Sequence, residues 1–150
     1  MTQHAAARLA VGASAGLALA CGSPTDPNTQ RVVGTIDPAF SAAPVIDAPG
    51  QVRSGVAFLV TVRTVGSSSC VTPDGGKVEV SASLARVTPY DQVPAPGHDI
   101  ACTRDYAPHP RNLTVTLKQS GPARLRVVGL SASSADPVLD SVEVQVTVAP

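Results

Sequence analysis

Hydrophobic and polar residues alternate with a period of two along most of the chain after residue 30. In residues 141–148 four valines occupy positions 142, 144, 146 and 148 and polar residues lie between them. Such alternation places one face of a strand in a core and the other in water. A helix would instead repeat its apolar positions every three to four residues. The pattern therefore predicts β-strands from Gln30 onward.

The alternation defines about seven short strands, separated by turn signals every 8–15 residues. They are residues 30–36, 44–46, 56–64, 77–87 with an interruption near Ser83, 112–117, 123–127 and 141–148. The segment 56–64 is apolar on both faces and is expected in the centre of a sheet, whereas the first two strands are expected at edges. Gly121 and Pro122 predict a hairpin that joins 112–117 to 123–127.

This arrangement is typical of an all-β, antiparallel sandwich, and its architecture resembles immunoglobulin-like and fibronectin-like domains. The resemblance is limited to architecture, because the chain has no Trp and because Ile100 stands where antibody domains carry Tyr, two residues before a Cys. Hydrophobic residues make up 43% of the 150 residues, most of them Ala and Val, with two Phe and two Tyr. The core is therefore expected to be aliphatic.

The first 20 residues have the pattern of an export signal. Arg8 precedes an apolar run at 9–20 that contains no acidic residue. A run of about 12 residues is too short to span a membrane, which needs about 20. The chain is thus expected to comprise a signal peptide at 1–20, a polar tether at 21–29 and a β-sandwich domain at 30–150.

The residues before Cys21, Leu17-Ala-Leu-Ala20, resemble the lipobox of bacterial lipoproteins. This resemblance implies that Cys21 becomes the first residue of the mature protein and is the lipid attachment site. Its acyl chains, such as palmitate, would anchor the chain in a membrane. The lipobox favours Leu at the position of Ala18, and Ala18-Leu-Ala20 also fits the site of ordinary signal peptidase, so a secreted form remains an alternative.

The three cysteines have different expected fates. An odd thiol is a liability in an oxidising compartment, and lipidation of Cys21 would leave Cys70 and Cys102 to form a disulfide. A tetrahedral zinc site formed by both cysteines with His98 and His109 is the alternative, but their spacing lacks the close pairs typical of zinc sites. No cofactor or metal is expected.

Residues 88–110 contain five prolines and no regular alternation, so they are expected to form a long loop held by the disulfide. Most of the chemically versatile side chains of the mature chain lie in or beside this segment, which is therefore the candidate binding loop. They are Tyr90, Asp91, His98, Asp99, Arg104, Asp105, Tyr106, His109 and Arg111. The alternative is that these polar residues merely solvate a surface loop.

Charge and targeting pattern restrict the expected partners. The mature chain carries 10 basic and 11 acidic residues, a net charge near −1, and the basic residues are scattered, which argues against a nucleic-acid partner. We expect a membrane, contacted through the lipid anchor, and an envelope protein. Gly22 stands where an Asp retains some lipoproteins at the inner membrane, so the outer membrane or the cell surface is favoured.

Three functions are compatible with the sequence. The favoured one is a non-catalytic interaction or structural module of the bacterial cell envelope. A small-ligand or carbohydrate-binding domain would use Tyr90 and Tyr106 as aromatic platforms. A hydrolase would use His98 or His109 beside an Asp, but no mature Ser lies in a recognisable nucleophile setting. We therefore expect that the protein is not an enzyme.

Overall fold

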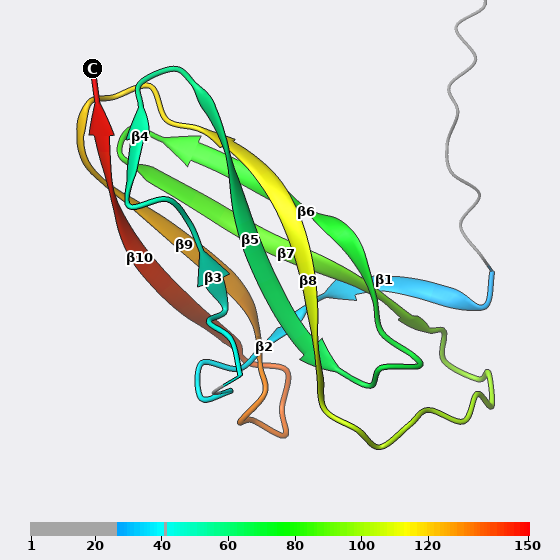
Figure 1. The fold of residues 1–150 in the computed structure, drawn as a ribbon. Coiled ribbons are helices and arrows are strands. Elements are labelled where there is room, and N and C mark those ends of the chain that lie inside the picture. Colours follow the sequence, from blue (N-terminus) through cyan, green and yellow to red (C-terminus); the bar gives the residue numbers. More distant parts are fainter. Residues whose placement is uncertain (1–26, 41) are drawn as a thin grey trace, which may run out of the picture.

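The computed structural model describes residues 27–40 and 42–150, which form ten β-strands in two sheets (Figure 1). The sheets pack into a β-sandwich, as the alternating pattern predicts. No helix long and apolar enough to cross a membrane occurs in the described ranges. The predicted export signal at 1–20, the lipid attachment site Cys21 and most of the tether at 21–29 lie outside the described residues.

The larger sheet contains seven strands. They are β1 (Thr29–Val33), β2 (Thr35–Ile36), β4 (Gln51–Arg53), β6 (Thr72–Ser81), β7 (Leu84–Pro94), β9 (Gly121–Ser131) and β10 (Leu139–Ala149). Three pairs, β1 with β7, β6 with β7 and β9 with β10, are antiparallel, whereas β7 with β9, β2 with β9 and β4 with β10 are parallel. The larger sheet is therefore mixed, where the sequence pattern predicts a purely antiparallel arrangement.

The smaller sheet has the order β3 (Ile46–Asp47), β5 (Ala57–Gly66) and β8 (Ala107–Thr116). The central position of β5 confirms the prediction for 56–64, and β3 lies at an edge as expected. Sheet membership differs from prediction for the two strands on either side of residues 118–120. They do not form a hairpin, because β8 pairs with β5 whereas β9 belongs to the larger sheet. Leu117 and Ala123 thus enter one core from opposite sheets.

The buried hydrophobic residues of the core between the sheets are all aliphatic, and Phe58 packs against them partly buried. Its buried members are Ile36, Val45, Ile46, Val52, Val60, Val62, Ala85, Val87, Val115, Leu117, Ala123, Leu125, Val127, Val146 and Val148. They include most inward-facing residues of the three clearest alternating segments, and Leu113, Val142 and Val144 pack against them partly buried. Burial of these side chains supplies the main stabilisation of the fold, at about 25 cal/mol per Å² of apolar surface.

Residues 77–87, expected as one interrupted strand, form a tight hairpin between β6 and β7. Ser81 pairs with Leu84 and the turn consists of Ala82 and Ser83. Ala82 has φ 49°, in the left-handed region that Gly or Asn occupies more readily. The usual Asn-Gly signal is thus missing, which explains why the sequence pattern does not reveal the turn.

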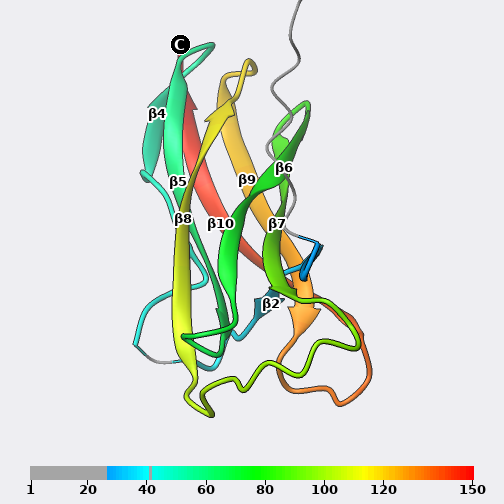
Figure 2. The same cartoon turned by 90° about the vertical axis from the view of Figure 1, so that its right-hand side faces the viewer.

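The two ends of the sandwich differ in their connections (Figures 1 and 2). One end, here called the loop end, carries the connections at 67–71, 95–106 and 132–138. The other, here called the hairpin end, carries the β6–β7 turn and residues 118–120. The chain enters β1 at the loop end, because Thr29 pairs with Pro94 and the Ala95 amide donates to the Asn28 carbonyl at 2.8 Å.

Candidate functional site

The structure separates the nine candidate residues into strand and loop positions. Tyr90 and Asp91 belong to β7, His109 and Arg111 belong to β8, and the remaining five lie in the loop 95–106. The predicted loop 88–110 is therefore too long at both ends. Pro108 and Pro110 are tolerated in β8 because their nitrogens face away from β5. Arg63 of β5 lies opposite Pro110, and its amide donates to the Val45 carbonyl, on the side of β3, at 2.8 Å rather than to β8.

Asp91 and Arg111 form an ion pair inside the sandwich rather than on its surface. Arg111 Nη2 lies 2.5 Å from Asp91 Oδ1, and their side chains are only 4% and 3% exposed. Thr64 of β5 completes the group, since its hydroxyl donates to Asp91 Oδ1 at 3.1 Å and accepts a hydrogen bond from Arg111 Nη2. The two residues expected to bind a partner thus join the two sheets internally.

Backbone carbonyls satisfy most of the remaining Arg111 donors. Nη1 donates to the carbonyls of Tyr90 and, at 3.3 Å, of Gly75, and Nη2 also reaches the His109 carbonyl at 3.3 Å. Within the described ranges, Arg111 Nε and His109 Nε2 are the buried side-chain nitrogens without a hydrogen-bond partner. The guanidinium is therefore fixed by three backbone carbonyls, by the Thr64 hydroxyl and by one carboxylate, which leaves it little freedom to contact an external ligand.

Gly34 explains how this ion pair is covered. The segment β1–β2 fills the fork where β7 and β9 diverge, because the Gly34 amide donates to the Pro89 carbonyl at 2.9 Å and its carbonyl accepts from the Leu130 amide at 3.0 Å. A Cβ at this position would overlap the Thr64 methyl group and lie 2.7 Å from Asp91 Oδ2. Only a residue without a side chain fits here.

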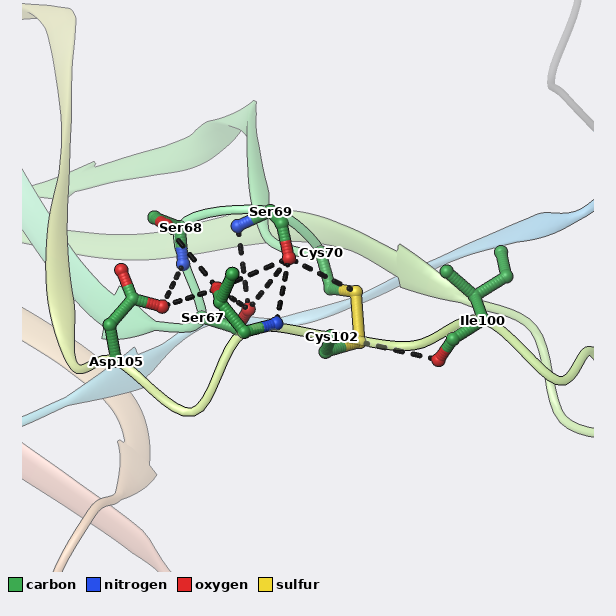
Figure 3. The surroundings of a disulfide bond; sticks show 8 residues. Ser67, Ser68, Ser69, Cys70, Ile100, Cys102 and Asp105 are labelled. Carbon is green, nitrogen blue, oxygen red and sulfur yellow. Dashed lines mark hydrogen bonds between the residues drawn. A yellow bond between two sulfur atoms is a disulfide. The ribbon is translucent and has the colours of Figure 1, made fainter.

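At the loop end, a disulfide fixes the loop 95–106 to the β5–β6 connection. Cys70 and Cys102 are joined, with Cα atoms 5.5 Å apart, which confirms the predicted pair. Figure 3 shows that the bridge is flanked by a group of side chains that join the same two segments, here called the hydroxyl cluster. Its members are Ser67, Ser68, Ser69, Thr103 and Asp105.

Asp105 is the single charged member of the hydroxyl cluster. The Ser68 amide donates to its carboxylate at 3.1 Å, and the Thr103 hydroxyl donates to the same oxygen. Hydrogen bonds from Ser68 and Thr103 stabilise the ionised form and lower the pKa of Asp105 to about 2. The carboxylate thus serves as an acceptor that orders the loop and would be a poor general base near neutral pH.

Tyr106 closes the other side of the loop. Its hydroxyl donates to Asp37 Oδ2 at 2.9 Å, and its ring meets the Phe40 ring edge to face at a centroid distance of 5.6 Å. Burial, followed by the bond to Asp37, raises the pKa of Tyr106 to about 12. The phenol therefore remains protonated and ties the loop to the segment after β2.

Tyr90 lies on the outer face of the larger sheet. The Arg31 guanidinium stands 4.2 Å from its ring centroid and also pairs with Asp74 at 3.0 Å. This face of the aromatic ring is therefore already occupied by a cation. Tyr106, by contrast, is 48% exposed.

All five candidate residues of the loop 95–106 are exposed to solvent. Asp105 and Tyr106 form hydrogen bonds to other segments, whereas the side chains of His98, Asp99 and Arg104 form no hydrogen bond or ion pair in the part of the chain that the structure describes. The surface hollows of about 720 Å³ and about 460 Å³ are lined by other residues, near the hairpin end.

The zinc alternative is incompatible with the structure, because Cys70 and Cys102 are bonded to each other. Across residues 27–40 and 42–150, no group of three His, Cys, Asp or Glu side chains is placed to hold a metal ion. His109 belongs to β8 and its side chain is buried, whereas His98 lies in the exposed loop 95–106. The two histidines considered for a hydrolase thus occupy unlike environments.

Sequence reasoning missed Thr64, Gly34 and the serines before Cys70. Thr64 lies at an inward-facing position of an alternating strand. A polar residue at such a position indicates a buried hydrogen-bond partner, and this was the signal that the sequence offered. Gly34 interrupts an otherwise β-branched segment, which indicates close backbone approach. Comparison of the chain with protein-family models, with curated proteins and with solved structures finds no match.

Proposed function

We propose that the chain is a lipid-anchored protein of the bacterial cell envelope whose sandwich is a non-catalytic interaction module. The observation that carries this proposal is the use of the candidate residues for structure. Asp91 and Arg111 form a buried ion pair, and Asp105 and Tyr106 hold the loop. The remaining exposed groups, His98, Asp99 and Arg104, suit recognition of a protein surface better than catalysis.

The cysteine pairing supports the anchor. Because Cys70 and Cys102 bond to each other, Cys21 has no partner within the chain. Lipidation would remove this odd thiol from an oxidising compartment. The lipobox-like segment before Cys21 and the apolar run at 9–20 agree with the same processing.

The position of β1 supports a defined orientation on the membrane. Seven residues, 22–28, separate Cys21 from β1, which begins at Thr29, and they span at most about 25 Å when extended. Since Thr29 lies beside Pro94, the loop end would face the bilayer and the hairpin end would face away from it. A short tether with a rigid domain is suited to presenting a surface at a fixed distance from a membrane.

Mass spectrometry of the mature N-terminus tests the anchor. The expected product begins at Cys21 and carries diacylglycerol, and a Cys21→Ser variant is expected to leave the membrane fraction. A mature protein that begins at Cys21 with a free thiol, or that retains residues 1–20, would contradict the proposal.

The interaction role is tested by exposed charge substitutions. The triple change of His98, Asp99 and Arg104 to Ala is expected to weaken saturable capture of an envelope protein by the anchored chain. A matched triple change of Lys77, Glu79 and Gln145, which are exposed on the larger sheet, should leave capture intact. Equal capture by both variants would remove the loop from the proposal.

A further inference from the structure

The two sheets leave an open seam between the edge strands β6 and β8. In Figure 2 these strands ascend beside each other on the side that faces the viewer. β6 pairs with β7 and β8 pairs with β5, and no ladder joins β6 to β8. Both strands begin at the loop end, so their free edges run parallel to each other.

The hydrogen-bond alternation identifies the free groups on β8. Arg63 N donates to Val45 rather than to β8, so the pairs of Arg63 with Pro110 and of Leu59 with Thr114 are not hydrogen-bonded. The backbone amides and carbonyls of every second β8 residue therefore point away from β5. These residues are Pro108, Pro110, Asn112, Thr114 and Thr116.

The same reasoning applies to β6. Pro89 accepts from Gly34, so its carbonyl points away from β6, and the pair of Gly76 with Pro89 is not hydrogen-bonded. Alternation then directs the backbone groups of Val78 and Val80 into the seam. Each edge thus presents unpaired donors and acceptors, the feature that attracts an additional strand.

Half of the seam is closed by its own side chains. At the loop end, Arg111 reaches across from β8 to the Gly75 carbonyl at 3.3 Å, and a Cβ at Gly76 would lie 2.8 Å from Leu113 Cδ1. Pro108 and Pro110 lack the amide hydrogen that an added strand would need. Strand addition is therefore blocked in this half.

The other half, towards the hairpin end, is open. A hollow of about 460 Å³ lies there, lined by Val80, Ala82, Thr116, Lys118 and Gln119. Val80 pairs with the fully buried Ala85 and so faces the core side, yet it is 43% exposed. An inward-facing valine exposed beside two free strand edges indicates an incomplete sandwich at this point.

We infer that this open half-seam binds an extended segment of a partner protein by strand addition. The segment would run antiparallel to both edges, cover about five residues and place an apolar side chain over Val80. Lys118 lies on the rim and forms no ion pair among the described residues, so a carboxylate near the N-terminal end of the segment would complement it. This inference rests on the proposal that the sandwich is an interaction module, and it adds a second contact surface, at the hairpin end, to the loop 95–106 at the loop end.

A proline scan of the edge tests the inference. Thr114→Pro removes an amide hydrogen that faces the seam and leaves the β5 ladder intact, as Pro108 and Pro110 already do. Thr114→Ala keeps the amide and is the matched control. The probe is the peptide acetyl-Glu-Val-Thr-Val-Thr-Val-amide, added to the mature full chain in detergent micelles, with amide exchange followed by NMR.

In the free chain the amides of Val78, Val80, Thr114 and Thr116 are expected to exchange fast. The peptide should protect them, and Thr114→Pro should weaken binding roughly tenfold, the equivalent of one or two hydrogen bonds, whereas Thr114→Ala should not. Replacing the peptide Glu by Lys should also weaken binding.

Three results would overturn the inference. The first is equal peptide binding by Thr114→Pro and Thr114→Ala. The second is a lack of protection of the four amides at millimolar peptide. The third is amide protection that rises with protein concentration alone, which would assign the seam to a second copy of the chain. Far-ultraviolet circular dichroism verifies that the Thr114→Pro variant is folded. The measurement of peptide protection on Thr114→Ala does not depend on the folding of the proline variant. Loss of the lipid in Cys21→Ser leaves this exchange pattern unchanged, so a failed anchor and a failed seam are distinguishable.

Discussion

The buried ion pair between Asp91 and Arg111 gives the sharpest prediction about stability. Asp91→Asn preserves the shape of the side chain and removes its charge. The guanidinium of Arg111 then remains 4% exposed without a counter-charge, with one nitrogen already lacking a partner. Desolvation of this cation is no longer offset, so the variant should be strongly destabilised.

The magnitude follows from the burial of the pair. Removal of one partner of a buried ion pair costs about 3–5 kcal/mol. A domain of about 120 residues unfolds with an entropy of about 250 cal/mol/K, so each kcal/mol lowers Tm by about 4 °C. We therefore expect Asp91→Asn to lower Tm by about 12–20 °C at neutral pH.

Thermal and urea unfolding, followed by circular dichroism on the mature protein, measure this effect. Glu143→Gln is the matched control, because Glu143 also pairs with arginines, at 2.9 Å from Arg126 Nη2, but on the exposed face of the sheet. An exposed pair contributes about 0–1 kcal/mol. The control should therefore shift Tm by at most about 4 °C.

A double substitution separates the lost ion pair from general damage. Asp91→Leu with Arg111→Met replaces both charges by apolar side chains, and such replacements are often neutral or better. The double variant should be more stable than Asp91→Leu alone and than Arg111→Met alone. If Asp91→Asn resembles Glu143→Gln, or if the two single effects simply add, the ion pair does not join the sheets as argued.

Three further predictions concern the disulfide, the loop and the fork. The change of both Cys70 and Cys102 to Ala opens a loop of about 33 residues and should cost about 3–4 kcal/mol in urea unfolding. The folded pKa of Asp105, about 2, is below its unfolded value of 3.8, so its contribution is full above pH 3.8 and disappears as pH falls towards 2. The Asp105→Asn variant should therefore lose less stability than the parent chain over that interval. Gly34→Ala should destabilise by about 1–3 kcal/mol, because the new methyl group overlaps Thr64.

The predictions for Asp105 and for Gly34 each have a control within the same chain. Asp99→Asn alters an exposed carboxylate of the same loop and should leave the acid dependence of unfolding as in the parent chain. Gly50→Ala adds a methyl group where no atom lies within 4 Å, and should change stability little. Identical acid profiles for Asp105→Asn and Asp99→Asn, or equal losses for both glycine variants, would contradict the corresponding assignment.

Local alternation was sufficient to predict the class of fold and its core. Period two specifies which side chains face inward, and the inward valines of β10 and the apolar residues of β9 lie in the core as expected. The disulfide was also predictable, because it depends on the number of cysteines and on the compartment. The inward-facing positions follow from alternation within each strand, and the disulfide follows from the cysteine count, so neither inference requires knowledge of which strands are neighbours.

Pairing between strands was not predictable, because alternation says nothing about which strand is the neighbour. Leu117 and Ala123 face inward whether their strands form a hairpin or belong to opposite sheets. The prolines led to a wrong prediction of a loop for the same reason. Pro108 and Pro110 suggest a loop until the direction of their nitrogens is known, and that direction depends on the partner strand β5.

The candidate site shows the same dependence on partners. Asp91 and Arg111 are 20 residues apart and seem equally suited to a surface loop, since charged residues are seldom fully buried. Their burial requires Thr64 from a third strand and Gly34 from the link between β1 and β2. Only the assembled topology reveals this combination.

The topology also relates the tether to the open seam. The chain enters at the loop end, and the open half of the seam lies at the hairpin end, near Val80 and Lys118. Strands of 10 or 11 residues separate the two ends by about 35 Å, at about 3.3 Å per residue. In the lipid-anchored form that we propose, the half-seam that closes itself would therefore face the membrane, and the half with free edges would face a partner. The prolines of β8 fit this division, because they protect the half in which strand addition would compete with the bilayer surface.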